Sequence, residues 1–170
     1  MLPRGSLRCA AAGLLIALVP LGGAAGCGPL GDDAELSEAQ FIAEGDAICK
    51  RGRAQYAELQ KDPPQSAGEA AELTRRLIEI TESEIDDLRD LNAPTDSEGA
   101  LADYLDSREA GLRVLQKGLA AAEDEDAEAY AEAQAQVARG QVDRARLAEE
   151  VGFTECSKPL TGSGGDQKDQ

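Results

Sequence analysis

The side chains of this chain that could do chemistry are cysteines and carboxylates, because histidine is absent. Without imidazole there is no general base for Ser-His or Cys-His pairs, and the usual zinc and di-iron ligand sets are missing. The four cysteines, Cys9, Cys27, Cys49 and Cys156, include no C-x-x-C pair and have no other soft ligand nearby. We therefore predict no metal site and no cofactor. A carboxylate-based hydrolase remains as the least favoured function.

Cys27 stands at the end of a pattern typical of an export signal. Residues 1–8 carry two arginines and no acid, residues 10–21 are almost wholly apolar, and residues 22–26 are all small. A charged start, a short apolar stretch and small residues before a cut describe a secretory signal peptide. An uncleaved membrane-spanning helix is one alternative, because the uncharged stretch is long enough, but prolines and glycines crowd its second half. Ordinary secretion with an incidental cysteine is the other alternative.

The tetrapeptide Ala24-Ala25-Gly26-Cys27 resembles the lipobox of bacterial lipoproteins, although that family prefers Leu where this chain has Ala24. The resemblance implies that the Cys27 thiol receives a diacylglyceryl group and that a peptidase removes residues 1–26. It also implies a lipid-anchored protein at the extracytoplasmic face of the cell membrane, because two or more acyl chains anchor firmly. The membrane, reached through Cys27, is then its first partner.

Loss of Cys9 with the signal and lipidation of Cys27 leave one pair of cysteines, Cys49 and Cys156. Exported proteins meet an oxidising environment, which favours a disulfide between such a pair. Closing a loop of about 100 residues stabilises a fold by roughly 4–5 kcal/mol in the chain-entropy model. We therefore predict a Cys49–Cys156 disulfide.

The charge of the remaining chain is strongly negative. Removing residues 1–26 leaves 144 of 170 residues, the size of one domain. The removed part holds two of the 17 basic residues and none of the 33 acidic ones, so the formal charge changes from −16 to −18. Such a surface disfavours nucleic acid and anionic lipid headgroups, which carry the same sign. An acidic surface attracts cations or basic partners, but the simpler interpretation is that it keeps an exported domain soluble.

Apolar residues at helical spacing predict four helices and no strand. Capping-box patterns begin the first helix at Ser37 and the second at Ser66, residues 95–98 open the third, and Gly152 ends the fourth. The fourth helix, from around Asp126 to Val151, has an apolar face with few large side chains. We expect this face to consist of Tyr130, Val137, Val142, Ala145, Ala148 and Val151.

The predicted disulfide determines how these helices are connected. The chain must reverse near residues 123–128, because one continuous third helix would carry Cys156 far from Cys49. Either the segment 152–156 then folds back along the first helix, or the fourth helix ends early. We predict an all-α, up-down-up-down four-helix bundle over residues 37–158. A flexible tether at 27–36 precedes the bundle, and a tail at 159–170 is disordered by composition.

Charged residues interrupt two of the apolar stripes. Arg108 falls between two leucines of the third helix, and Glu84 interrupts the second helix beside Thr81. A buried arginine needs a carboxylate partner, which Glu84 or Glu79 could supply. The favoured alternative is that Arg108 snorkels at the edge of the core, as long basic side chains commonly do. Thr81, Glu84 and Arg108 together form a hypothetical polar pocket inside the bundle.

The acidic run at 123–126 invites a calcium-binding interpretation. The spacing of an EF-hand fails, because no glycine stands at the sixth position counted from Asp124 and Ala135 occupies the twelfth. Acidic residues at a helix N-terminus are favourable through the helix dipole alone. The run therefore does not change the prediction of no metal site.

In its whole layout the chain resembles the small, uncharacterised helical lipoproteins of high-GC Gram-positive-type bacteria. The resembling features are the lipobox, "FIAEGDAIC" in the first helix and "VGFTEC" near the end, and they imply no catalytic residues. We expect a membrane-anchored, extracytoplasmic lipoprotein that acts as a non-enzymatic interaction or accessory domain, with envelope proteins as partners. The alternative is a small-ligand- or cation-binding lipoprotein that serves a transporter or a sensor.

Overall fold

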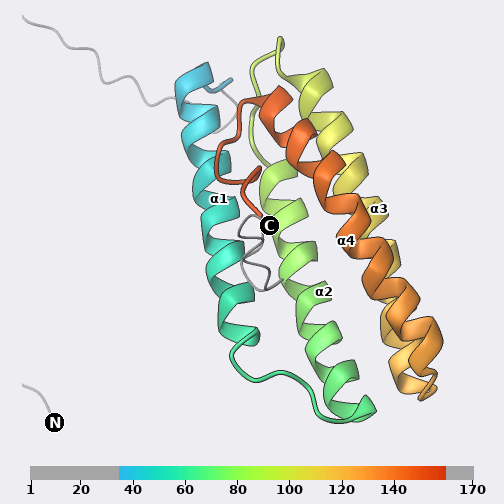
Figure 1. Ribbon diagram of the computed structural model, residues 1–170. Coiled ribbons are helices and arrows are strands. Elements are labelled where there is room, and N and C mark those ends of the chain that lie inside the picture. The colour runs from blue at the N-terminus through green and yellow to red at the C-terminus, as the bar shows by residue number, and fades with distance from the viewer. Residues whose placement is uncertain (1–34, 160–170) are drawn as a thin grey trace, which may run out of the picture. The chain divides into compact units, whose positions relative to one another are not determined.

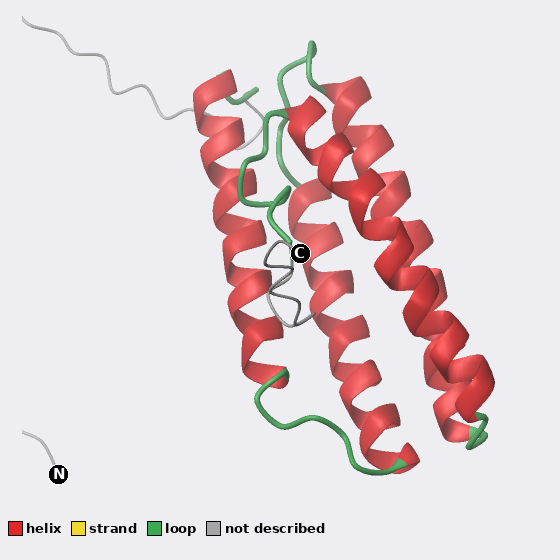
Figure 2. Ribbon diagram, viewed as in Figure 1, coloured by secondary structure: helices red, strands yellow, loops and turns green. Residues whose placement is uncertain are grey.

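The computed structural model describes residues 35–159, which lie in one compact unit. The predicted signal peptide, Cys27, most of the predicted tether and the tail from residue 160 lie outside the described residues. The described part consists of α1 (Glu38–Leu59), α2 (Ala67–Arg89), α3 (Glu98–Glu123) and α4 (Ala127–Val151), joined by loops and without any strand (Figure 2). None of these four helices has the length and apolarity needed to cross a membrane.

The helices pack in chain order and alternate in direction, which confirms the predicted up-down-up-down bundle (Figure 1). α3 packs against both α2 and α4, and α1 packs on α2. The first and last helices make few direct contacts with each other. The segment that follows α4 returns beside α1 instead (Figure 1). The bundle is therefore more open between α1 and α4 than between the other neighbours.

The first two helices begin at the predicted serines. The hydroxyl of Ser37 accepts from the N–H of Gln40, and the Gln40 side chain accepts from the N–H of Ser37, so both halves of this capping box form. At Ser66 only one half forms, because the hydroxyl accepts from the N–H of Glu69 while the Glu69 carboxylate accepts from the N–H of Gln65. The capping patterns thus located both helix starts.

The later helix ends also follow from local chemistry. α3 begins at Glu98 after Ser97, whose side chain makes no capping bond, so its start lies at the end of the predicted opening. The chain reverses within the predicted region: Glu125 adopts a left-handed φ of 57°, and the Asp126 carboxylate caps α4. Gly152, with φ of 96°, ends α4 as predicted. Among the described residues no group of three or more potential ligands is placed to hold a metal ion.

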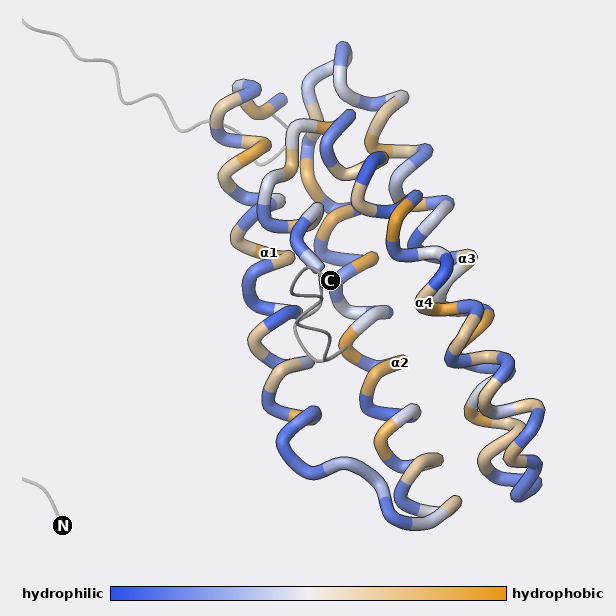
Figure 3. The backbone as a smooth tube through the Cα atoms, in the orientation of Figure 1, coloured by the Kyte–Doolittle hydropathy of each residue, from blue (hydrophilic) through white to orange (hydrophobic). Residues whose placement is uncertain are grey.

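The core consists of apolar clusters at two levels of the bundle, with polar residues between them. Along every helix hydrophobic and hydrophilic residues alternate, as expected for helices with one buried face (Figure 3). The upper cluster comprises Phe41, Ile48, Cys49, Leu88, Leu101, Tyr104, Ala148, Val151 and Phe153. The lower clusters comprise Leu77, Ile78 and Leu115, and Ala70, Ala71 and Ala122. Between the two levels α2 contributes Glu84, α3 contributes Arg108 and α4 contributes Arg144. We call these three residues the polar layer.

The buried face of α4 differs from the prediction at one residue. Val142 was predicted to be buried, but 75% of its surface is exposed. The other five predicted residues are buried or partly buried, as expected. The face runs through the predicted Val137 and Val151 and includes Arg144, which lies seven residues from each of them. The prediction chose aliphatic residues and passed over an arginine at a position that the helical period places on the buried side.

The last two residues of the predicted tether are attached to the bundle. The N–H of Leu36 donates to the carbonyl oxygen of Asn92 at 2.9 Å, and the side chain of Leu36 packs against the upper cluster. The carboxylate of Glu35 accepts from the N–H of Thr95. The chain therefore enters the bundle beside the α2–α3 loop.

Candidate functional site

The segment 152–159 forms one wall of the candidate site, and a glycine on α1 makes room for it. A Cβ built at Gly45 would lie 2.2 Å from the ring of Phe153, which is buried. The rings of Phe41 and Tyr104 pack around Phe153 at centroid distances of 5.1 and 6.2 Å. Of the two predicted alternatives, the segment therefore folds back along the first helix, and α4 runs to Val151.

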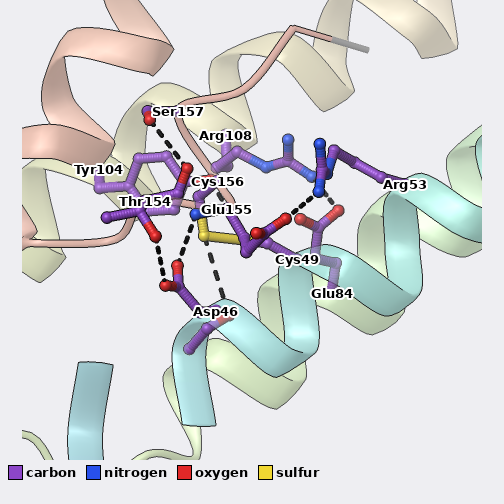
Figure 4. The surroundings of a disulfide bond; sticks show 11 residues. Asp46, Cys49, Arg53, Glu84, Tyr104, Arg108, Thr154, Glu155, Cys156 and Ser157 are labelled. Carbon is purple, nitrogen blue, oxygen red and sulfur yellow. Dashed lines mark hydrogen bonds and ion pairs between the residues drawn. A yellow bond between two sulfur atoms is a disulfide. The ribbon is translucent and has the colours of Figure 1, made fainter. Parts of the chain in front are cut away.

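The disulfide between Cys49 and Cys156 forms as predicted and joins α1 to this wall across 107 residues of sequence. One turn earlier on α1, the carboxylate of Asp46 accepts from the hydroxyl of Thr154 and from the N–H of Glu155, both at 2.7 Å (Figure 4). The wall is thus held to α1 by one covalent bond and by charge-assisted hydrogen bonds, which are stronger than neutral ones.

The predicted polar residues Glu84 and Arg108 meet inside the bundle. The Arg108 Nη2 donates to Glu84 Oε2 at 2.5 Å, and only 14% and 12% of the two side chains are exposed. Arg108 therefore does not snorkel, and the other candidate partner, Glu79, is exposed on the surface. Burial raises the pKa of Glu84 above its usual range against the opposing attraction of Arg108. Burial alone would lower the pKa of Arg108, but the adjacent Glu84 carboxylate raises it, so this guanidinium stays charged.

Arg144 lies in the same layer without a carboxylate. Among the described residues none forms an ion pair with Arg144, whose Nη2 donates to the carbonyl oxygen of Val137 at 3.0 Å. Burial and the positive charge of Arg108 lower the pKa of Arg144. The polar layer therefore holds two guanidinium groups and a single carboxylate.

Glycines on three helices leave the space that these charged groups occupy. A Cβ at Gly52 of α1 would lie 3.0 Å from the Glu84 carboxylate. A Cβ at Gly111 of α3 would lie 3.2 Å from the Arg144 guanidinium, and a Cβ at Gly140 of α4 would lie 2.6 Å from it. A glycine inside a helix costs about 1 kcal/mol of helix stability relative to alanine. At these three positions the loss is accompanied by space for a charged side chain.

A cleft of about 460 Å³ opens between α4, α1 and the returning wall. The buried Tyr104 lines this cleft together with Arg53, Arg108 and Arg144. The Arg53 guanidinium pairs with the Glu155 carboxylate of the wall (Figure 4). The Nε atoms of Arg53 and Arg108 are buried and have no hydrogen-bond partner. Two guanidinium groups of residues that line the cleft are thus incompletely satisfied, which is rare for buried polar atoms.

The predicted pocket residues Thr81, Glu84 and Arg108 also line one cavity, a narrow one of about 70 Å³ on the other side of the polar layer. The Thr81 hydroxyl there donates to the carbonyl oxygen of Leu77 at 2.7 Å, so it is already engaged within its own helix. Glu84, Arg108 and Arg144 line both cavities, which places the polar layer as the partition between them.

Sequence reasoning missed Arg53, Arg144 and Tyr104 as residues of the cleft. The spacing of Arg144 from Val137 and Val151 was a usable signal. No pattern in the sequence pointed to Arg53, because its partner Glu155 is 102 residues away. Comparison of the chain with protein-family models, curated proteins and solved structures found no match. The geometry of the cleft and the N-terminal sequence are therefore the basis for the function.

Proposed function

We propose that this protein is a lipid-anchored extracytoplasmic binding protein that takes a small polar ligand in the cleft between α1 and α4. The observation that carries this proposal is the cleft itself, whose volume of about 460 Å³ lies in the range of small-ligand sites. Its wall is preformed, because the disulfide and the Asp46 hydrogen bonds hold the segment 152–159 against α1. A preformed concave site loses little conformational entropy when a ligand binds.

The location follows from the N-terminal sequence and agrees with the disulfide. Lipid on Cys27 would anchor the chain, and a Cys49–Cys156 disulfide is typical of proteins that work in an oxidising compartment. Between Cys27 and the attached Glu35 the chain spans at most about 28 Å. The bundle would therefore work close to the membrane surface, where a transporter or sensor could receive its ligand.

We propose binding rather than catalysis because two of the three carboxylates that line the cleft are engaged in ion pairs, and the third, Glu149, is exposed. Glu84 pairs with Arg108, and Glu155 pairs with Arg53 and Lys158. A carboxylate pair that acts as acid and base needs groups free to exchange protons with a substrate. These pairs suit a site that orients a ligand by charge.

The anchor is tested by cell fractionation of the protein and its Cys27→Ala variant. We expect the wild type to sediment with membranes and to enter the detergent phase on phase separation. The variant should lose the lipid and should not enter the detergent phase. Equal detergent partition of the two proteins would contradict lipid attachment at Cys27.

The cleft is tested by thermal unfolding with a panel of small anionic, cationic and neutral metabolites. We expect at least one class to raise the melting temperature of the wild type and of Ala138→Phe, which places a ring on the exposed face of α4. Ala145→Phe, which places the same ring in the cleft, should abolish the rise. If no compound binds while crosslinking in native membranes captures a protein on the outer helix faces, the protein is an interaction domain instead.

A further inference from the structure

We propose that the ligand of this cleft carries an anionic group, a carboxylate or a phosphate, which binds between the Arg144 guanidinium and the Nε donors of Arg53 and Arg108. This inference rests on the proposed function and specifies the chemical class of the ligand. It follows from the distribution of charge, from the unpaired guanidinium and from the unsatisfied donors, which are independent features of the site.

Basic residues outnumber acidic ones in the cleft, whereas acidic residues outnumber basic ones in the whole chain. The whole sequence holds 17 basic and 33 acidic residues. Of the 16 residues that line the cleft, five are basic and three are acidic. A surface selected only for solubility has no reason to gather its scarce arginines around one concavity. Inside a cleft, low-dielectric walls strengthen the field of such a group of charges.

Arg144 supplies a positive charge that no described carboxylate neutralises. Its one hydrogen bond runs to a backbone carbonyl oxygen, and Arg108 beside it carries the same sign. A half-buried, unpaired charge next to a like charge costs stability. Gly111 and Gly140 nevertheless leave space for it. An anion in the cleft would offset both the repulsion and the missing partner.

The hydrogen-bond donors that remain free belong to residues that line the same cleft. The Nε groups of Arg53 and Arg108 are buried without an acceptor, although each guanidinium already binds one carboxylate through Nη2. The Tyr104 hydroxyl also lines the cleft, where the nearest partner is the Cys49 sulfur at 3.9 Å, a weak acceptor. Carboxylate and phosphate oxygens accept several such bonds at once, and guanidinium groups match both geometries.

Other ligand classes fit the site less well. A cation would meet the charges of Arg53, Arg108 and Arg144. Two of the three lining carboxylates already pair with arginines, and the third, Glu149, is exposed to solvent. A neutral ligand could accept the free hydrogen bonds but would leave the positive charge of Arg144 uncompensated. The excess of donors and positive charge therefore selects an anion.

The test is an NMR titration of the mature protein in detergent, with the arginine Nε–H resonances as the readout. The probes are inorganic phosphate and acetate, with choline and glycerol as the cationic and neutral comparisons, all at constant ionic strength. The variants are Arg144→Gln and the matched control Arg139→Gln, which removes the same charge from an exposed site on the same helix. Far-UV circular dichroism and an intact disulfide show that each variant is folded.

We expect phosphate, acetate or both to shift the Nε resonances of Arg53 and Arg108 saturably in the wild type and in Arg139→Gln. In Arg144→Gln the affinity should fall about tenfold or more, which corresponds to about 1.4 kcal/mol. The stronger of the two probes identifies the anion as phosphate or carboxylate. Arg144→Lys keeps the positive charge but lacks the paired N–H donors of a guanidinium group. It should therefore lose less affinity than Arg144→Gln.

Equal affinity in Arg144→Gln and Arg139→Gln would mean an adventitious surface ion and would overturn this inference. If neither anion shifts the cleft resonances while choline, glycerol or another panel compound does, the anionic class is wrong and cleft binding stands. If no compound reaches the cleft in either experiment, the proposed function fails with it.

Discussion

The ion pair between Glu84 and Arg108 gives the most informative perturbation of the fold, because only 12% and 14% of the two side chains are exposed. Arg108→Met keeps much of the side-chain volume and leaves the Glu84 carboxylate buried without its partner. Breaking a buried ion pair on one side costs about 3–5 kcal/mol of unfolding free energy. For a domain of this size, roughly 4 °C per kcal/mol gives a fall in melting temperature of about 12–20 °C.

The loss should depend on pH in a defined direction. Burial raises the pKa of Glu84 above its usual range, and removal of the arginine takes away an interaction that opposes this rise. In the variant, therefore, the penalty of the buried carboxylate is present at high pH and is relieved as the pH falls through the folded-state pKa and the group becomes neutral. The difference in stability between wild type and Arg108→Met should shrink from pH 7 to pH 5.

The assay is urea unfolding under non-reducing conditions, followed by far-UV circular dichroism. Glu84→Leu combined with Arg108→Met should recover most of the loss, because an apolar pair of similar volume commonly replaces a buried ion pair. The matched control Arg139→Met removes one arginine from an exposed pair on α4 and should change stability little. If Arg108→Met costs no more than this control, the polar layer is not a buried ion pair and the reasoning is refuted.

Three further predictions concern the wall and the helices. Cys156→Ser should lower the unfolding free energy by about 2–5 kcal/mol in urea titration, since it releases a 107-residue loop; an unchanged midpoint would contradict a structural disulfide. Gly45→Ala should cost about 1–3 kcal/mol in the same assay, because its Cβ would overlap the buried ring of Phe153. Gly68→Ala, in open space on α2, should instead raise the unfolding free energy by about 0.5–1 kcal/mol. Equal changes in stability for the two variants would disprove the close approach of Phe153 to Gly45. Lys158 and other basic neighbours lower the pKa of Glu155, so its stabilisation is present above the unfolded-state pKa and lost as pH falls; the advantage of the wild type over Glu155→Gln should disappear in acid unfolding curves, and a constant difference would argue against the pairing.

The helices and the disulfide were predictable because local patterns encode them. Ser37 and Ser66 mark helix starts through side chains that bond within three residues, and Gly152 marks a helix end through its backbone conformation. The pairing of Cys49 with Cys156 followed from elimination once the N-terminal pattern had been interpreted as a lipobox. These inferences needed no knowledge of tertiary contacts.

The cleft was predictable only in part, because its residues come from segments that are distant in the sequence. Glu84 and Arg108 stood out as charges on leucine-rich stripes, whereas Arg144 lies on a stripe of small residues where an interruption is hard to notice. The open side of the bundle arises because α1 and α4 are separated by the returning wall. The two alternatives for that wall stayed open, since the segment 152–156 is too short to show periodicity.

The most direct test of the central claim, that the α1–α4 cleft is an anion-binding site, is anomalous diffraction from crystals of the mature protein soaked in selenate. Selenate reproduces the charge and tetrahedral shape of a phosphate, and selenium marks its position. We predict an anomalous peak in the cleft at about 4 Å from the nearest guanidinium nitrogen of Arg144, because the selenate oxygens that accept the hydrogen bonds lie at about 3 Å. Peaks only at exposed arginines such as Arg139 or Arg113, with the cleft empty at saturating selenate, would contradict it.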